Sequence, residues 1–164
     1  MKIKVIIPNS GMDRETLNAR ERMLSRAVSK ETIISADCIQ LGPESIESNT
    51  EEALAAVEVI KRCIAAERDG FDAVIIYCFS DLAIDAAREN VSIPVIGPGE
   101  VTLSAAGMLS NRFTVVTTTW KQVENYQEYN RFAKALAKHL GTRVRPACSD
   151  YPARQFALRR ELLG

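Results

Sequence analysis

Hydrophobic and polar positions follow two periods along the chain. Short apolar runs that end in Pro, Gly, Asn or Ser predict strands, and longer segments with apolar residues at three- and four-residue steps predict helices. The predicted strands are residues 2–8, 32–34, 71–77, 93–96, 112–118 and 142–145. The predicted helices are residues 12–29, 50–68, 82–89, 101–109, 124–140 and 155–163. This alternation predicts an α/β fold, with a right-handed parallel sheet flanked by helices in three layers.

The same pattern predicts which surfaces are buried. Residues 71–77 are almost continuously hydrophobic, as expected of a strand covered on both faces at the centre of a sheet. The expected buried stripe of the first helix is Leu17, Met23, Leu24 and Val28. The expected buried stripe of the second helix is Leu54, Val57, Ile60, Ile64 and Ala65, with Thr50, Glu51 and Glu52 at its amino-terminal cap. A second strand-helix series starts at the Gly-Pro-Gly turn, so we expect a first lobe at 1–97 and a partial second lobe at 98–164.

Composition narrows the class of partner. The chain has 164 residues, 46% of them hydrophobic, and Lys+Arg equals Asp+Glu at 21 each. With no basic excess, we expect neither a nucleic acid nor a membrane partner. No apolar run approaches the roughly 20 residues of a membrane span, and the start does not resemble a signal peptide. Four cysteines without a C-x-x-C pair, beside one histidine, argue against a metal site and favour reduced thiols in the cytoplasm.

Candidate chemistry is sought at the carboxyl ends of the strands, because ligands of open α/β sheets bind there. Cys78 follows a strand and precedes a predicted helix, where backbone N–H groups and the helix dipole favour a thiolate. A thiolate at this position can take a proton or attack carbon. Asn9, Ser10, Thr117 and Thr118 are neutral hydrogen-bonding residues at other strand ends, suited to a carboxylate or an imide ring.

Each of these groups also has a purely structural interpretation. Asn9 and Ser10 are residue types that can cap the first helix, and Ser80 and Asp81 can cap the helix after Cys78. The Thr triplet 117–119 has the β-propensity of a strand. Cys38 and Cys63 are expected to pack in the core, and Cys148 stays undecided. The segment 97–100 suits an anion at a helix start but lacks the glycine patterns of nucleotide sites.

Five segments taken in order resemble the aspartate/glutamate/hydantoin racemase family, and the hydantoin or allantoin racemase branch is the most similar. The resemblance covers roughly residues 3 to 145. The segments are Ile6–Ser10, Gly42–Glu47, Tyr77–Asp81 with Ala86–Glu89, Pro94–Gly97 with Gly99–Glu100, and Arg112–Thr118.

The resemblance implies a cofactor-independent isomerase with two α/β lobes facing each other across a cleft. Each lobe of such an enzyme contributes one cysteine, so that one thiolate removes the α-proton and the other thiol returns a proton to the opposite face. Cys78 matches the first of these cysteines. The residues that match or neighbour the family's ligand-contacting positions, and that we expect to bind substrate, are Asn9, Ser10, Pro43, Phe79, Ser80, Asp81, Thr117 and Thr118.

The chain also departs from the family pattern. No residue matches the second cysteine, which the family places in a Gly-Cys-Ala-Gly-like segment of the second lobe. Cys148 lies in a different context, between Ala147 and Ser149, and does not take this role. An incomplete second lobe leaves apolar surface to cover, which predicts a homo-oligomer.

Three functions remain open. The first is a racemase or epimerase acting on a small molecule with a carboxylate or an imide, such as a hydantoin, allantoin or amino acid. The second is a one-cysteine relative, either a decarboxylase of arylmalonate type or a maleate-type isomerase. The third is a remnant that binds a small acid or cyclic ureide without turnover.

Overall fold

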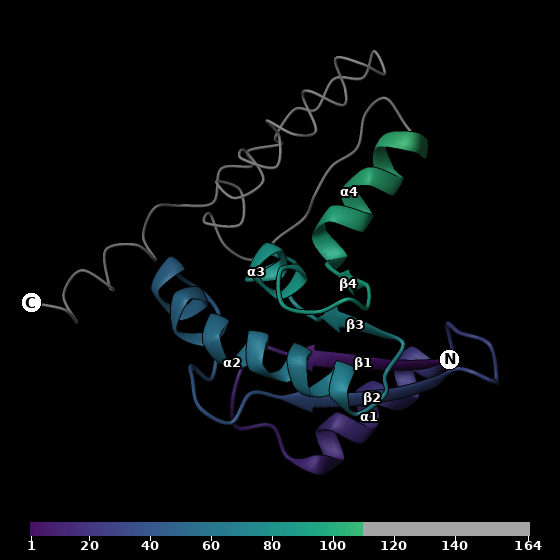
Figure 1. Cartoon of the computed structure of the whole chain (residues 1–164), viewed down its shortest axis with the longest axis horizontal. Helices are drawn as coiled ribbons and strands as arrows, with labels where there is room; N and C mark the ends of the chain where they lie inside the picture. The colour runs from purple at the N-terminus through teal and green to yellow at the C-terminus, as the bar shows by residue number, and fades with distance from the viewer. Residues whose placement is uncertain (110–164) are drawn as a thin grey trace, which may run out of the picture.

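The computed structural model of the chain describes residues 1–109 (Figure 1). In chain order the elements are β1 (Lys2–Ile7), α1 (Arg14–Ser25), β2 (Ile33–Cys38), α2 (Asn49–Arg68), β3 (Ala73–Ile76), α3 (Ile84–Arg88), β4 (Val95–Ile96) and α4 (Pro98–Leu109). The predicted alternation of strands and helices is therefore confirmed over this range. The strands expected at 112–118 and 142–145 and the helices expected at 124–140 and 155–163 lie outside the described residues.

The four strands form one parallel sheet in the order β2-β1-β3-β4. Strand β1 lies between β2 and β3, with Ile7 opposite Cys38 and Ile6 opposite Ile76. Strand β3 has a neighbour on each side, which confirms the interior position expected from its hydrophobic run. Because all strands run in one direction, the loops that follow them meet at one edge of the sheet.

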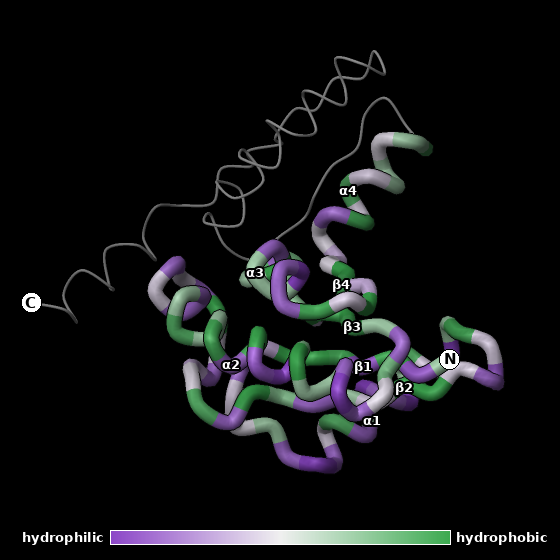
Figure 2. Tube along the Cα trace, viewed as in Figure 1, coloured by the Kyte–Doolittle hydropathy of each residue, from purple (hydrophilic) through white to green (hydrophobic). Residues whose placement is uncertain are grey.

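Helices pack on both faces of the sheet, as the three-layer prediction requires. One core cluster joins Ile6, Val74 and Ile76 to α2 and α3, and the other joins Val5 and Ile7 to Leu17 of α1. In Figure 2 the hydrophobic colour follows the central strands that supply these clusters. Since successive residues of a strand point to opposite faces, the run from Val5 to Ile7 supplies both clusters.

Helix α2 buries a different face from the one that we expected. Its buried residues are Ala55, Val59, Cys63 and Ala66. Leu54, Val57 and Ile64, expected in the core, are 62%, 58% and 41% exposed. Apolar residues recur at helical spacing on two faces of α2, so the spacing alone did not decide between them. The face with smaller side chains packs on the sheet, because they let the helix approach it closely.

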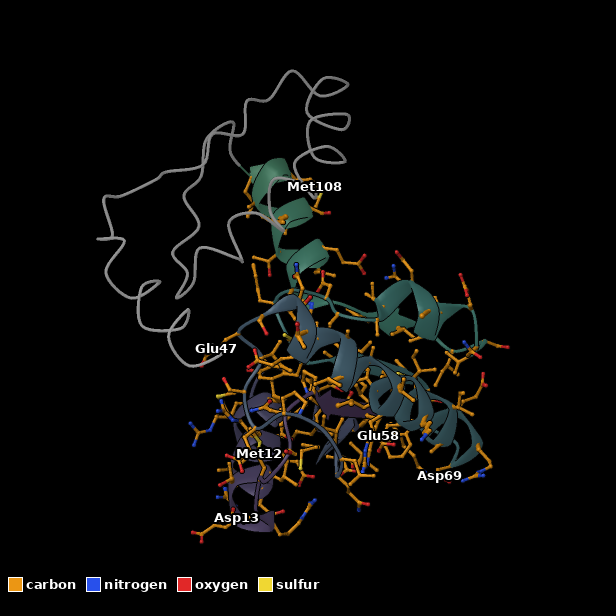
Figure 3. The ribbon with its side chains drawn as sticks, turned by 90° about the vertical axis from the view of Figure 1, so that its left-hand side faces the viewer. Met12, Asp13, Glu47, Glu58, Asp69 and Met108 are labelled. Carbon is orange, nitrogen blue, oxygen red and sulfur yellow. The ribbon has the colours of Figure 1, made fainter. Side chains whose placement is uncertain are left out.

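The starts of the first two long helices also differ from the expected ones. Helix α2 is capped by Ser48 and not by Thr50. The Ser48 hydroxyl accepts a hydrogen bond from the Glu51 N–H at 3.3 Å. The Glu51 carboxylate accepts in turn from the Ser48 hydroxyl at 2.9 Å and from the Glu47 N–H at 2.6 Å, and the sequence contains this Ser-x-x-Glu spacing of a capping box. Helix α1 is capped by Asp13, whose carboxylate accepts from the Thr16 N–H at 2.7 Å, and this hydrogen bond lowers the pKa of Asp13. Figure 3 shows Asp13 at the start of α1.

The buried stripe of α1 is narrower than expected. Leu17 is buried and Leu24 packs partly against the same core cluster, but Met23 is 44% exposed. The helix ends at Ser25, so Val28 lies beyond it. Leu17 and Leu24 are thus the residues of the expected stripe through which α1 contacts this face of the sheet.

Helix α4 starts three residues earlier than expected and projects away from the sheet (Figure 1). Met108 is at its far end, 78% exposed, and is labelled in Figure 3. The division into lobes at 1–97 and 98–164 stays a prediction, since most of the second range is outside the described residues. No helix within residues 1–109 has the length and apolar character needed to cross a membrane.

Candidate functional site

Two loops at the carboxyl edge of the sheet are tied together by hydrogen bonds. The Ser10 N–H donates to the Pro43 carbonyl at 2.9 Å, and the Ser10 hydroxyl donates to the Gly42 carbonyl at 2.9 Å. The Asn9 side-chain amide donates to the Glu44 carbonyl at 3.2 Å. The structure thus brings together three of the expected site residues, Asn9, Ser10 and Pro43. Asn9 and Ser10 bind this loop and do not cap α1, so that alternative is wrong.

Cys78 lies two residues beyond β3, beside the end of β1. The Tyr77 N–H donates to the Ile6 carbonyl at 2.7 Å, which holds the start of this loop against β1. The Cys78 side chain is half-buried, and its Sγ lies 3.2 Å from the Ser80 hydroxyl oxygen. A hydroxyl at this distance can donate a hydrogen bond to a thiolate. The loop therefore holds a partly accessible sulfur next to a neutral donor.

The helix after this loop does not begin at the thiol. Helix α3 has five residues and starts at Ile84, and its N-cap Ala83 has left-handed backbone and no side-chain cap. Neither Ser80 nor Asp81 caps α3, so this structural alternative is also wrong. The first residue of α3 is thus six positions beyond Cys78, and not at residue 82 as we expected.

Asp81 caps a different helix, α4. Its side chain is buried, with 4% of the residue exposed. Its Oδ1 accepts from the Gly99 N–H at 2.9 Å, and its Oδ2 accepts from the Glu100 N–H at 2.6 Å. Pro98 has no N–H, and the Gly97 N–H donates to the Glu100 carboxylate at 3.4 Å. The segment 97–100 does hold an anion, but that anion is a side chain of the same chain.

Two glycines make room for this carboxylate. A Cβ on Gly97 would lie 2.4 Å from Asp81 Cγ, and a Cβ on Gly99 would lie 2.4 Å from the Phe79 carbonyl oxygen. Both distances are too short for any real contact, so these positions require glycine because of close approach. The sequence predicts an anion at this Gly-Pro-Gly segment, and the structure shows that the anion is the Asp81 carboxylate.

Arg88 and Glu100 complete the connection, and sequence reasoning assigned neither of them a role. Arg88 donates from Nε to the Val95 carbonyl at 3.1 Å and forms an ion pair with Glu100. The signal for Glu100 was present, because a Glu at the third helical position is typical of a capping box. These contacts fix the end of α3, strand β4 and the first turn of α4 to one another.

The remaining cysteines of the described range belong to the core, as expected. Cys38 is buried at the end of β2, and Cys63 is fully buried on the inner face of α2. Burial raises the pKa of the Cys63 thiol to about 12, so it stays protonated at neutral pH. Within residues 1–109, no three His, Cys, Asp or Glu side chains gather as metal ligands. Thr117, Thr118 and Cys148 lie outside the described residues.

Comparison with models of protein families matches residues 3–148 to the family described as Asp/Glu/Hydantoin racemase. A hydantoin racemase of Pseudomonas sp. (strain NS671) is 39% identical over 117 residues, which are 71% of this chain and 46% of that protein. A hydantoin racemase of Paenarthrobacter aurescens is 33% identical over 138 residues, 82% of this chain and 57% of that protein. The chain thus spans about half the length of the curated relatives that it matches.

Solved structures give the same result for the fold. An allantoin racemase from Klebsiella pneumoniae aligns with a TM-score of 0.72 and 34% identity, over 82% of this chain and 54% of that chain. An allantoin racemase from Pseudomonas fluorescens aligns with a TM-score of 0.71 and 29% identity, over 89% of this chain and 60% of that chain. The parallel sheet with flanking helices therefore matches the fold of these proteins.

Proposed function

Because this chain belongs to the Asp/Glu/hydantoin racemase family, we propose that it is a cofactor-independent racemase or epimerase that uses Cys78. The substrate class that we propose is a small molecule with an activated α-carbon, such as a 5-substituted hydantoin, allantoin or an amino acid. The names of the similar proteins support the first two of these. The observation that carries the proposal is the half-buried Cys78 thiol at the carboxyl edge of the sheet, beside the Ser80 hydroxyl.

The chemistry that we propose for Cys78 is proton transfer at carbon. The thiolate takes the α-proton and becomes a thiol, while the electron pair of the broken C–H bond delocalises into the neighbouring carbonyl. A second acid returns a proton to the opposite face of the planar intermediate, which inverts the centre. We assign that second acid to no described residue, and the experiment below tests whether the protein supplies one.

The groups around Cys78 are suited to a neutral or singly charged polar ligand. Asn9, Ser10 and Pro43 are held together at the end of β1, the strand next to the one that carries Cys78. Ser80 and the backbone of Phe79 belong to the Cys78 loop itself. We propose that these residues contact the substrate and, with backbone N–H groups, stabilise the oxyanion that forms when the proton leaves. Contacts from Thr117 and Thr118 stay predictions.

The experiment is to incubate one enantiomer of a 5-alkyl hydantoin, then of allantoin, with the protein in deuterated water. Optical rotation and α-deuterium content are recorded together, against a sample without protein that gives the spontaneous rate. We expect rotation to decay as deuterium enters. Cys78→Ser should abolish both signals, because a hydroxyl is not a base near neutral pH. Cys63→Ser is the matched control, and it should keep the activity because Cys63 is a core thiol.

Other outcomes select the other functions. Deuterium uptake with retained rotation would indicate that Cys78 acts alone on one face, as in one-cysteine relatives. No uptake, together with a raised melting temperature in the presence of hydantoin, would indicate binding without turnover. Full activity of Cys78→Ser would contradict the assignment of the thiol.

We also propose that the protein works in a reducing compartment such as the cytoplasm. The three cysteines of the described range are free thiols, which supports this proposal. The homo-oligomer stays a prediction, and the exposed apolar residues Leu54, Val57 and Ile64 on α2 are consistent with it. Sedimentation equilibrium measures the oligomeric state directly.

A further inference from the structure

We propose that Asp81 is a positioning residue that fixes the Cys78 loop to the first turn of α4. The inference rests on the proposed role of Cys78 as the proton-transfer group. It revises our expectation that Asp81 contacts the substrate, because the carboxylate is 4% exposed and accepts hydrogen bonds from α4.

Asp81 is linked to Cys78 through the backbone. The Asp81 N–H donates to the Cys78 carbonyl at 3.0 Å, so the residues between them form a tight turn. Asp81 itself has a φ of 52°, in the left-handed region that Asp adopts more readily than most residues. The thiol and the carboxylate thus stand at the two ends of one turn with a defined shape.

Asp81 is linked to α4 through its side chain. Both carboxylate oxygens accept from successive backbone N–H groups, those of Gly99 and Glu100. A negative charge is also favoured at a helix N-terminus, where the dipole is positive. Without side chains on Gly97 and Gly99, the carboxylate approaches this backbone directly. Moving a buried carboxylate away from two charge-assisted hydrogen bonds costs free energy, because the charge would lose both donors. The carboxylate therefore holds the loop and the helix in a fixed relative position.

The two links together relate the thiol to the chain that follows residue 97. The Cys78 loop leaves the sheet after β3, whereas α4 begins the segment that leads out of the described range. The Asp81 side chain joins these two parts at the sheet edge. A catalytic group displaced by about 1 Å can lose about a hundredfold in rate, so a loosened connection should lower kcat.

The test compares two substitutions at position 81 with a matched control. Asp81→Asn keeps one acceptor oxygen but places an NH2 group against an N–H donor, and Asp81→Ala removes both acceptors. Asp69→Asn is the control, because it makes the same change of charge on an exposed side chain at the C-terminal end of α2. The first readout is the rate at which iodoacetamide labels each cysteine in substrate-free protein, measured by mass spectrometry. The second is kcat and KM in the deuterium assay.

We expect Cys78 labelling to rise about tenfold in Asp81→Ala and less in Asp81→Asn, because the loop that half-buries the thiol opens locally. Cys63 should stay protected in both variants, and Asp69→Asn should behave as the wild type. We also expect kcat to fall in the same order, while KM stays within about twofold, because Asp81 acts through Cys78 and not on the ligand.

Two results would overturn the inference. One is Cys78 labelling within about twofold of the wild-type rate in both folded variants, since an anchored loop cannot lose its anchor without local opening. The other is a parallel rise of Cys63 labelling, which would show that Asp81 only stabilises the whole fold. The labelling rate can be measured without turnover. Its result is therefore independent of the test of the proposed function, which asks whether Cys78→Ser loses activity.

Discussion

Gly99→Ala is predicted to destabilise the protein, although alanine favours helices more than glycine does. Gly99 is the second residue of α4, and a Cβ there would lie 2.4 Å from the Phe79 carbonyl oxygen and 2.8 Å from Asp81 Oδ2. The carbonyl belongs to the backbone and cannot rotate away, so Asp81 and the helix must separate. The perturbation therefore acts on the contact between the Cys78 loop and α4 from the helix side.

The expected magnitude follows from the contacts that are lost. The two hydrogen bonds to the buried carboxylate are also the cap of α4, and their loss costs about 3 kcal/mol, at about 1.5 kcal/mol each. The helix propensity of alanine returns about 1 kcal/mol. The net prediction is a loss of about 2 kcal/mol in the free energy of unfolding. In urea this shifts the midpoint down by about 1 M, since slopes for small proteins are about 1–3 kcal/mol/M.

Gly107→Ala in the same helix is the matched control. A Cβ on Gly107 meets nothing within 4 Å, so this variant should gain about 1 kcal/mol from helix propensity alone. Both variants are unfolded in urea and followed by far-UV circular dichroism. The two substitutions should shift the midpoint in opposite directions. If Gly99→Ala were as stable as Gly107→Ala, the close approach of Asp81 to α4 would be refuted.

Two further predictions concern the core. Cys63 has an ordinary thiol pKa of 9.0 that burial raises to about 12. Below pH 9 the Cys63 thiol is protonated in the folded and in the unfolded chain. Between pH 9 and pH 12 only the unfolded chain loses the proton. The free energy of unfolding therefore falls over this range by up to about 1.4 kcal/mol per pH unit. Urea unfolding at pH 8 and pH 10 should show the wild type losing more stability than Cys63→Ala, and equal losses would contradict the burial of the thiol. Val59→Ala should cost about 2 kcal/mol because Val59 is fully buried. Val57→Ala should cost less than about 0.5 kcal/mol because its side chain is exposed, and a reversed order would mean that α2 packs through its other face.

The sequence predicted the order of strands and helices well because each strand is short, apolar and followed by turn residues. It also placed Asn9, Ser10, Pro43 and Cys78 at strand ends, and a parallel sheet brings such ends to one edge. The burial of Cys63 was expected because a free cysteine within a helix packs as a small apolar residue.

What the sequence did not predict depends on contacts between distant segments. Asp81 and Gly99 are 18 residues apart, and nothing in the spacing shows that the carboxylate of one meets the N–H of the other. The two apolar faces of α2 are equally regular in sequence, and only packing on the sheet separates Val59 from Val57. Hydrogen bonds between residues close in sequence are easier to predict. The spacing of Ser48 and Glu51, for example, indicates the start of α2.

The close approach of Asp81 to α4 also limits how this chain can change by mutation. A side chain at position 97 or 99 requires the space that the carboxylate occupies, whereas a smaller residue at position 81 leaves that space empty and the helix without its cap. Substitutions at these three positions are therefore not independent, and the effect of a double change should differ from the sum of the single ones. In a redesign of this sheet edge, positions 81, 97 and 99 have to be chosen as one set.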